Sequence, residues 1–150
     1  MRAVLSYFGI PGRAEATRIA LAIARVNYED KRLSFPEFAA CPFKALPVYQ
    51  MDGTDYTQST ALLRYAGKLG GLYPQDALAS LKVDEIVMMA EDVFINLFST
   101  MGEQDEAKKK CKALMTGKLK DLLDAIARKL AANPSSPFCV GDSLTIADIQ

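Results

Sequence analysis

Two stretches of the chain bring together residue types that could bind a small peptide and its carboxylate. Pro47 cannot donate a hydrogen bond to a sheet, so it belongs at a strand start or an edge, and the bond before it can be cis. The backbone of Leu46 is then left to pair with an extended ligand. Ser59 stands where it would cap a helix running to about Leu69, and helix N-termini bind carboxylates. Taken alone, these residues favour the simpler interpretation, an ordinary hairpin and a capped helix.

Tyr7 is the candidate reactive side chain. It ends a strand predicted over 3–7, and a breaker-rich turn, Phe8-Gly9-Ile10-Pro11-Gly12, separates this strand from a helix predicted over 13–25. Open α/β sheets bind ligands at the carboxyl ends of their strands, so Tyr7 stands at a predicted ligand site. The competing interpretation is an aromatic ring packed in the core.

The chain contains no histidine, which excludes His-based triads, zinc hydrolases and the usual proton shuttles. Its three cysteines, Cys41, Cys111 and Cys139, are odd in number and far apart. This spacing argues against a disulfide framework and against a zinc site. The turn after the first strand also lacks a Cys-x-x-Cys pair, so dithiol exchange is disfavoured.

The charge balance excludes several classes of partner. Eighteen basic residues balance eighteen acidic ones, so no positive excess is available for nucleic acid or an anionic membrane. The longest clean apolar run, residues 19–24, is too short to span a membrane, and the start of the chain lacks a signal-peptide core. We therefore expect an intracellular protein that binds neither nucleic acid nor membranes.

The predicted elements fall into two parts. Strand, helix, strand, short helix, hairpin and helix follow one another up to about residue 69, with the hairpin turning at Asp52-Gly53. After a break at 70–74, apolar residues recur at helical spacing over 86–101 and 111–130, and we expect both stripes to be core. The prediction is an α/β chain: a thioredoxin-like domain over 1–74, βαβ then ββα, followed by an all-helical domain over 75–150.

Short motifs spread along the chain carry a family resemblance. They are Tyr7-Phe8 with Gly12-Arg13-Ala14-Glu15 and Arg18, Phe43-Lys44-Ala45-Leu46-Pro47-Val48, Asp52-Gly53, Gln58-Ser59, Leu63-Arg64-Tyr65 and Gly71-Leu72-Tyr73-Pro74. Together they resemble the cytosolic glutathione transferases of the tyrosine type, the sigma class most of all. The resemblance implies that the glutathione thiolate attacks a small hydrophobic electrophile in the cytoplasm, with glutathione as co-substrate and with neither a cofactor nor a metal.

The resemblance implies catalytic roles for Tyr7 and Arg13. A free thiol with a pKa of about 8.5 is only a few per cent thiolate at neutral pH, so the site must stabilise the anion. Tyr7 would donate a hydrogen bond to the sulfur, and Arg13 would add a positive charge. Ser6 is the reserve candidate, because some classes of the family use serine.

The resemblance also implies which residues hold glutathione. The backbone of Leu46, just before Pro47, would pair with the cysteinyl part of the ligand by strand addition. Gln58 and Ser59 would hold the γ-glutamyl end at the helix N-terminus. Asp92 of the partner subunit would approach the γ-glutamyl amine; the alternative for this residue is an exposed helix charge.

Three further positions depart from the family or complete its pattern. Phe35 stands in the segment where sigma-like members place a tryptophan and a lysine, and the lysine is missing. Lys44 either substitutes for a polar residue of the family or is simply exposed. Phe43 aligns with an aromatic residue that many members insert between two helices of the neighbouring subunit, which predicts a homodimer. Local packing against Pro42 is the alternative for Phe43.

Two other functions remain open. One is a specialised isomerase such as the sigma-type prostaglandin D synthase, which uses the same thiolate on one substrate. The other is a non-enzymatic structural or interaction module, because fold does not fix activity. Retention of Tyr7, Arg13, Gln58 and Ser59 argues against the second.

A last motif announces a new helix at the end of the sequence. Thr145 stands at the cap with Asp148 three residues on, and Leu144 and Ile149 occupy staple positions. Only Gln150 follows, and isolated helices below roughly 12 residues are marginal. We therefore expect the 150 residues to be an incomplete chain that leaves apolar stripes uncovered.

Overall fold

The computed structural model describes residues 3–42, 45–98 and 104–150. The chain divides into two compact units, Met1–Pro74 with Ile149–Gln150, and Gln75–Asp148. The first unit contains the sheet and the second is helical, so the predicted fold class is confirmed. Phe43 and Lys44 lie outside the described residues.

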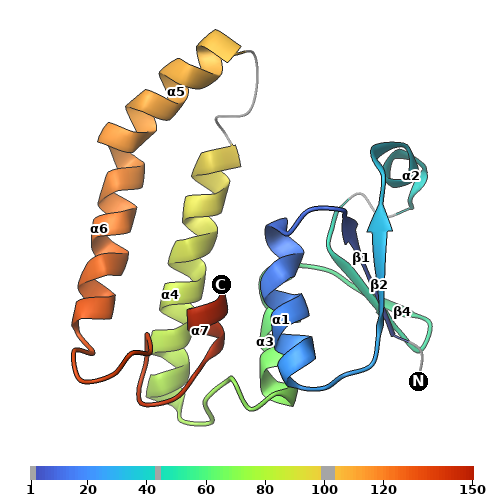
Figure 1. Cartoon of the computed structure of the whole chain (residues 1–150), viewed down its shortest axis with the longest axis horizontal. Helices are drawn as coiled ribbons and strands as arrows, with labels where there is room; N and C mark the ends of the chain where they lie inside the picture. Colours follow the sequence, from blue (N-terminus) through green and yellow to red (C-terminus); the bar gives the residue numbers. More distant parts are fainter. Residues whose placement is uncertain (1–2, 43–44, 99–103) are drawn as a thin grey trace. The chain divides into compact units, whose positions relative to one another are not determined.

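The sheet has four strands in the order β2-β1-β3-β4 (Figure 1). In chain order these are β1 (Ala3–Phe8), β2 (Glu29–Leu33), β3 (Val48–Met51) and β4 (Thr54–Tyr56). β2 runs parallel to β1, whereas β3 is antiparallel to both β1 and β4. The β3–β4 hairpin turns at Asp52 and Gly53, both with positive φ, as the Asp-Gly pair predicts.

Helices cover one face of this sheet. A short 3₁₀ helix, η1 (Gly12–Ala14), leads into α1 (Glu15–Ile23), which packs beside α3 (Ser59–Leu69) (Figure 1). The strands alternate, so Ala3, Leu5 and Tyr7 are buried while the residues between them are half-exposed. Leu5 lies opposite Tyr49 in β3, and Tyr49 meets Leu21 of α1 and Leu62 of α3.

The third helix of the unit, α2 (Phe35–Ala40), is held by its cap and by aromatic contacts. The Glu37 carboxylate accepts hydrogen bonds from the backbone N–H and hydroxyl of Ser34, at 2.7 and 2.6 Å, which lower the pKa of Glu37. The Phe8 ring lies 5.0 Å from Phe35 and 5.3 Å from Phe38, measured between centroids. α2 is therefore anchored to the last residue of β1.

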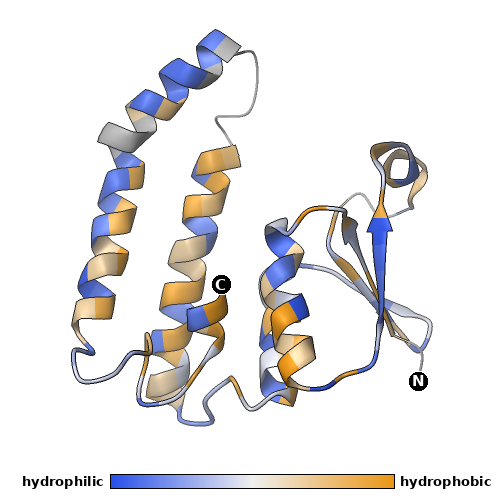
Figure 2. Cartoon of the chain, in the orientation of Figure 1, coloured by the Kyte–Doolittle hydropathy of each residue, from blue (hydrophilic) through white to orange (hydrophobic). Residues whose placement is uncertain are grey.

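The second unit contains four helices among the described residues. They are α4 (Ala77–Phe98), α5 (Gln104–Thr116), α6 (Lys118–Ala131) and α7 (Ile146–Ile149). Its buried side chains include Val83, Ile86 and Val87 of α4, Leu119 of α6 and Ile146 of α7. The colouring of Figure 2 shows hydrophobic residues along much of α4 and mainly hydrophilic ones on α5. None of the helices in the described ranges is long and apolar enough to cross a membrane.

Part of the predicted helical core is exposed. Leu97 and Leu130 are each 42% exposed, and Cys111 is exposed as well, although all three belong to the apolar stripes. Helical spacing places such side chains on one face, but burial also needs a neighbour over that face. The described residues supply it for Ile86 and Leu119 and leave the outer parts of both stripes open.

Candidate active site

Tyr7 lies at the end of β1 with its ring in the core and its hydroxyl against the following turn. Its side chain is buried, and the hydroxyl oxygen accepts a hydrogen bond from the backbone N–H of Arg13 at 3.1 Å. A phenol that accepts one bond through its oxygen keeps its hydrogen for another acceptor, and donates it more readily. Tyr7 is thus arranged as a hydrogen-bond donor.

Gly12 explains how the turn comes so close to the phenol. Its φ is +45°, and a Cβ placed on it would lie 2.6 Å from the Tyr7 hydroxyl oxygen and 2.9 Å from a ring carbon. Any other residue would collide with the ring that Arg13 N–H must reach. The predicted helix start at Arg13 is therefore wrong by two residues: η1 occupies 12–14, and α1 begins at Glu15.

Leu46 and Pro47 enter the sheet beside this end of β1. Ser6 pairs with Val48 in the antiparallel ladder, so the two residues before Val48 lie alongside Tyr7 and Phe8. The Leu46–Pro47 bond is cis, as the sequence allowed; Pro47 is buried and Leu46 half-buried. The backbone of Leu46 is thus beyond the paired part of β3, at the end of β1 where Tyr7 stands.

The N-terminus of α3 follows the β3–β4 hairpin. The cap position belongs to Gln58, with φ +74°, and half-buried Ser59 is the first helical residue, so the prediction of Ser59 as the cap is off by one. The Gln58 carbonyl already accepts the first helical bond, from Leu62 N–H at 3.0 Å. The amides of the first turn have no partner inside a helix, which suits them to a carboxylate.

The remaining predicted residues occupy separate places. Phe35 is 76% exposed on α2, with its ring against Phe8. Asp92 is exposed on α4, in the second unit, where its backbone carbonyl accepts a bond from the side chain of Asn96 at 2.6 Å. Arg13 is half-buried beside Tyr7. The predictions for Phe43 and Lys44 fall outside the described residues.

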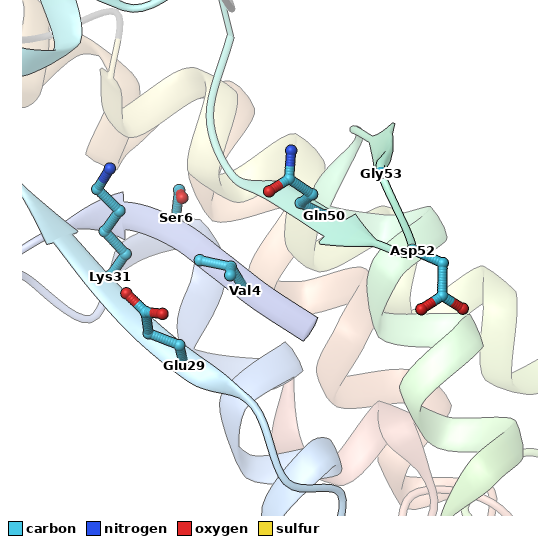
Figure 3. A pocket seen from close by; sticks show the side chains of 7 residues that line it. All are labelled: Val4, Ser6, Glu29, Lys31, Gln50, Asp52 and Gly53. Carbon is cyan, nitrogen blue, oxygen red and sulfur yellow. The ribbon is translucent and has the colours of Figure 1, made fainter. Parts of the chain in front are cut away.

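Ser6 lies on the opposite face of the sheet from Tyr7. It lines a hollow of about 530 Å³ on the face away from α1 and α3. Figure 3 shows its side chain between Lys31 of β2 and Gln50 of β3. Because neighbouring strand residues point to opposite faces, Ser6 cannot replace Tyr7 beside the turn. The reserve assignment of Ser6 therefore has no support in this geometry.

Arg18 is the functional candidate to which sequence reasoning gave no role. It is 6% exposed on α1, and its guanidinium lies 5.8 Å from the centre of the Tyr7 ring. It forms ion pairs with Glu15 at 2.9 Å and Asp30 at 3.2 Å. Burial, followed by the negative charge of Asp30, raises the pKa of the nearby Tyr28 hydroxyl. The i,i+3 spacing of Glu15 and Arg18 was the only local signal of this cluster.

Comparison with known proteins agrees with this geometry. The family models for "Glutathione S-transferase, N-terminal domain" and "Glutathione S-transferase, C-terminal domain" match residues 3–68 and 91–150. Glutathione S-transferase 4 of Caenorhabditis elegans is 34% identical, over 97% of this chain and 74% of the relative. Hematopoietic prostaglandin D synthase of Gallus gallus is 32% identical, over 96% of this chain and 73% of the relative.

Solved structures give the same result. Na-GST-3 of Necator americanus, described as monomeric, superposes with a TM-score of 0.83 at 27% identity, covering 99% of this chain and 77% of the other. The match extends over the sheet-containing unit and the helical one. This chain belongs to the glutathione S-transferase family.

Proposed function

We propose that Tyr7 activates glutathione by donating its phenolic hydrogen to the thiolate, which then attacks a small hydrophobic electrophile. The observation that supports this most is the Tyr7 hydroxyl at the carboxyl end of β1, its oxygen held by Arg13 N–H at 3.1 Å. This bond occupies the oxygen as an acceptor and leaves the hydrogen for an anion. Membership of the transferase family supplies the thiol.

The energy required is within reach of such a site. Lowering the thiol pKa by about two units, from about 8.5, takes about 2.7 kcal/mol of preference for the thiolate. A hydrogen bond to a charged group contributes about 1.5–3 kcal/mol. One bond from Tyr7 therefore accounts for most of the shift, and the positive charge of Arg13 would supply the remainder.

The same proposal assigns the binding residues. The Leu46 backbone, before Pro47, pairs with the cysteinyl part of glutathione, while Gln58 and Ser59 at the start of α3 hold the γ-glutamyl carboxylate. The geometry that supports this is the position of Leu46 beside the end of β1 and the free first turn of α3.

Further contacts would complete the ligand site. Phe35 would border the glycyl end and Lys44 its carboxylate. Asp92 of the partner subunit would reach the γ-glutamyl amine in a homodimer joined through Phe43. The monomeric Necator americanus relative shows that the assembly needs its own measurement.

We also propose that the protein works in the cytoplasm and needs no resident cofactor or metal. All three cysteines are free, as in a reducing compartment. Glutathione is consumed as a co-substrate. A prostaglandin D isomerase is the second candidate, because the Gallus gallus relative of that name is 32% identical and the same thiolate would serve either reaction. Assaying an aryl halide beside a prostaglandin endoperoxide separates the two.

The substitution Tyr7→Phe tests the assignment, with Ser6→Ala as a matched control that removes a hydroxyl from the opposite face. Tyr7→Phe should retain glutathione binding, raise the pKa of the bound thiol and lower conjugation to an aryl halide at least about tenfold. Ser6→Ala should leave all three unchanged. Full turnover by Tyr7→Phe at about pH 6.5, two units below the ordinary thiol pKa, would show that Tyr7 is not the activator.

A further inference from the structure

Arg18 is a buried charge whose partners come from three different segments. Its Nη1 group donates to the Glu15 carboxylate of α1 at 2.9 Å, and its Nε donates to Asp30 of β2 at 3.2 Å. Nη1 also donates to the backbone carbonyls of Ile10 at 3.2 Å and Pro11 at 3.3 Å. Burying a charge is costly unless it is paired, so this arrangement must be held by its partners as a unit.

The carbonyl contacts place Arg18 behind the turn that touches Tyr7. Ile10 and Pro11 immediately precede Gly12, the residue that approaches the phenol, and Arg13, the residue whose N–H donates to it. The guanidinium also lies 5.8 Å from the Tyr7 ring centre. One side chain therefore contacts both the turn and the ring that the turn must meet.

The charges around Arg18 cancel, so its effect on a distant sulfur is geometric. Glu15 and Asp30 are the two carboxylates paired with it, and Arg32 forms a second ion pair with Asp30 at 2.6 Å. Two positive and two negative groups sum to zero. A neutral cluster exerts little net field, whereas two hydrogen bonds to consecutive carbonyls fix the path of the chain.

We propose that Arg18 is a positioning residue for catalysis: it holds the Ile10–Pro11 turn so that Arg13 N–H stays on the Tyr7 oxygen and the phenolic hydrogen points to the substrate thiolate. This inference rests on the proposed role of Tyr7. If the turn relaxes, the Tyr7 oxygen loses its fixed donor, its hydrogen can turn to another acceptor, and the hydrogen bond to sulfur weakens.

The test compares Arg18→Met, Arg18→Lys and a matched control, Arg32→Met. Arg32 bonds to the same Asp30 carboxylate, by Nε at 2.8 Å, and is 44% exposed at its side chain. For each full-length variant, the ultraviolet absorbance of the thiolate, followed against pH, gives the pKa of bound glutathione. Turnover and KM for glutathione are measured alongside, with thermal melting to follow folding.

Arg18→Met should raise the bound-thiol pKa by about one unit, a tenfold loss of thiolate below that pKa, and lower kcat more than it changes KM. Arg18→Lys keeps the charge and should restore part of the shift, and Arg32→Met should match the wild type. In a Tyr7→Phe background, Arg18→Lys should cause no further rise in thiol pKa, because Arg18 acts through the Tyr7 hydroxyl.

Several results would overturn the inference. An unchanged thiol pKa in folded Arg18→Met or Arg18→Lys would do so, as would equal effects of Arg18→Lys with and without the Tyr7 hydroxyl. Loss of folding in both Arg18 variants would assign the residue to stability alone. If the wild type itself leaves the thiol pKa at its ordinary value of about 8.5, the role of Tyr7 fails first, and that outcome is distinct.

Discussion

Substitution of Gly12 by alanine should damage stability and catalysis together. An alanine at φ +45° costs about 1–2 kcal/mol. Its Cβ would lie 2.6 Å from the Tyr7 oxygen, roughly 1 Å short of an ordinary contact of about 3.5 Å. The ring is buried, so the turn must retreat, and a comparable lengthening of the 3.1 Å bond from Arg13 N–H breaks it, with a net loss of about 1 kcal/mol. We expect the free energy of unfolding to fall by about 2–3 kcal/mol.

Two other glycines separate the causes. A Cβ on Gly9 meets nothing within 4 Å, and Gly53 has φ +79° with the same open space. Gly9→Ala should change stability by less than about 0.5 kcal/mol, and Gly53→Ala by about 1 kcal/mol, both with normal conjugation activity. Gly12→Ala should conjugate an aryl halide about ten- to a hundredfold more slowly, since a misplacement of about 1 Å has effects of this size.

Urea unfolding and initial-rate kinetics measure both quantities on the same samples. If Gly12→Ala is as active as Gly53→Ala, the close approach of the turn to Tyr7 has no part in catalysis. If Gly12→Ala is as stable as Gly9→Ala, neither the backbone angle nor the collision has the cost derived above.

Three further predictions concern other parts of the chain. Phe43→Ser should shift sedimentation at low micromolar concentration from dimer to monomer, whereas an unchanged dimer would place the interface elsewhere. Although burial alone would raise the pKa of Asp148, bonds from the N–H groups of Cys139 and Thr145, both at 2.7 Å, lower it. Asp148→Asn should therefore cost about 2 kcal/mol at neutral pH, and this difference should shrink as pH falls below about 4 through the depressed pKa; a difference that persists in acid would contradict it. Lys129→Ala removes the half-exposed ion pair to Glu85 (2.8 Å) and should change stability by less than about 1 kcal/mol, and a larger loss in urea unfolding would show that this pair is not a surface bridge.

Local sequence signals predicted the elements that depend on local chemistry. The hairpin strands at 48–51 and 54–56 follow from an Asp-Gly turn whose two residues take positive φ. The Thr145 and Asp148 pair likewise predicted the start of α7, where the Asp148 carboxylate accepts from Thr145 N–H. Such features are decided within a few residues, so a single sequence reveals them.

Features that depend on distant partners were not predicted. Arg18 is buried because Asp30, twelve residues away, and two turn carbonyls surround it, and nothing in its own helix shows this. The start of α1 moved to Glu15 because the turn is drawn against Tyr7. Leu97 and Leu130 have core spacing, yet their exposure depends on what lies over them.

The two outer strands of the sheet bear on how copies of this protein behave when concentrated. β2 is an edge strand of alternating charge sign, with Glu29 and Asp30 followed by Lys31 and Arg32, and β4 at the other edge is only three residues long. A charged edge and a short edge both discourage a neighbouring sheet from adding its strands. Copies of the chain are thus protected against β-aggregation, and any ordered association must use side-chain surfaces in place of shared strands.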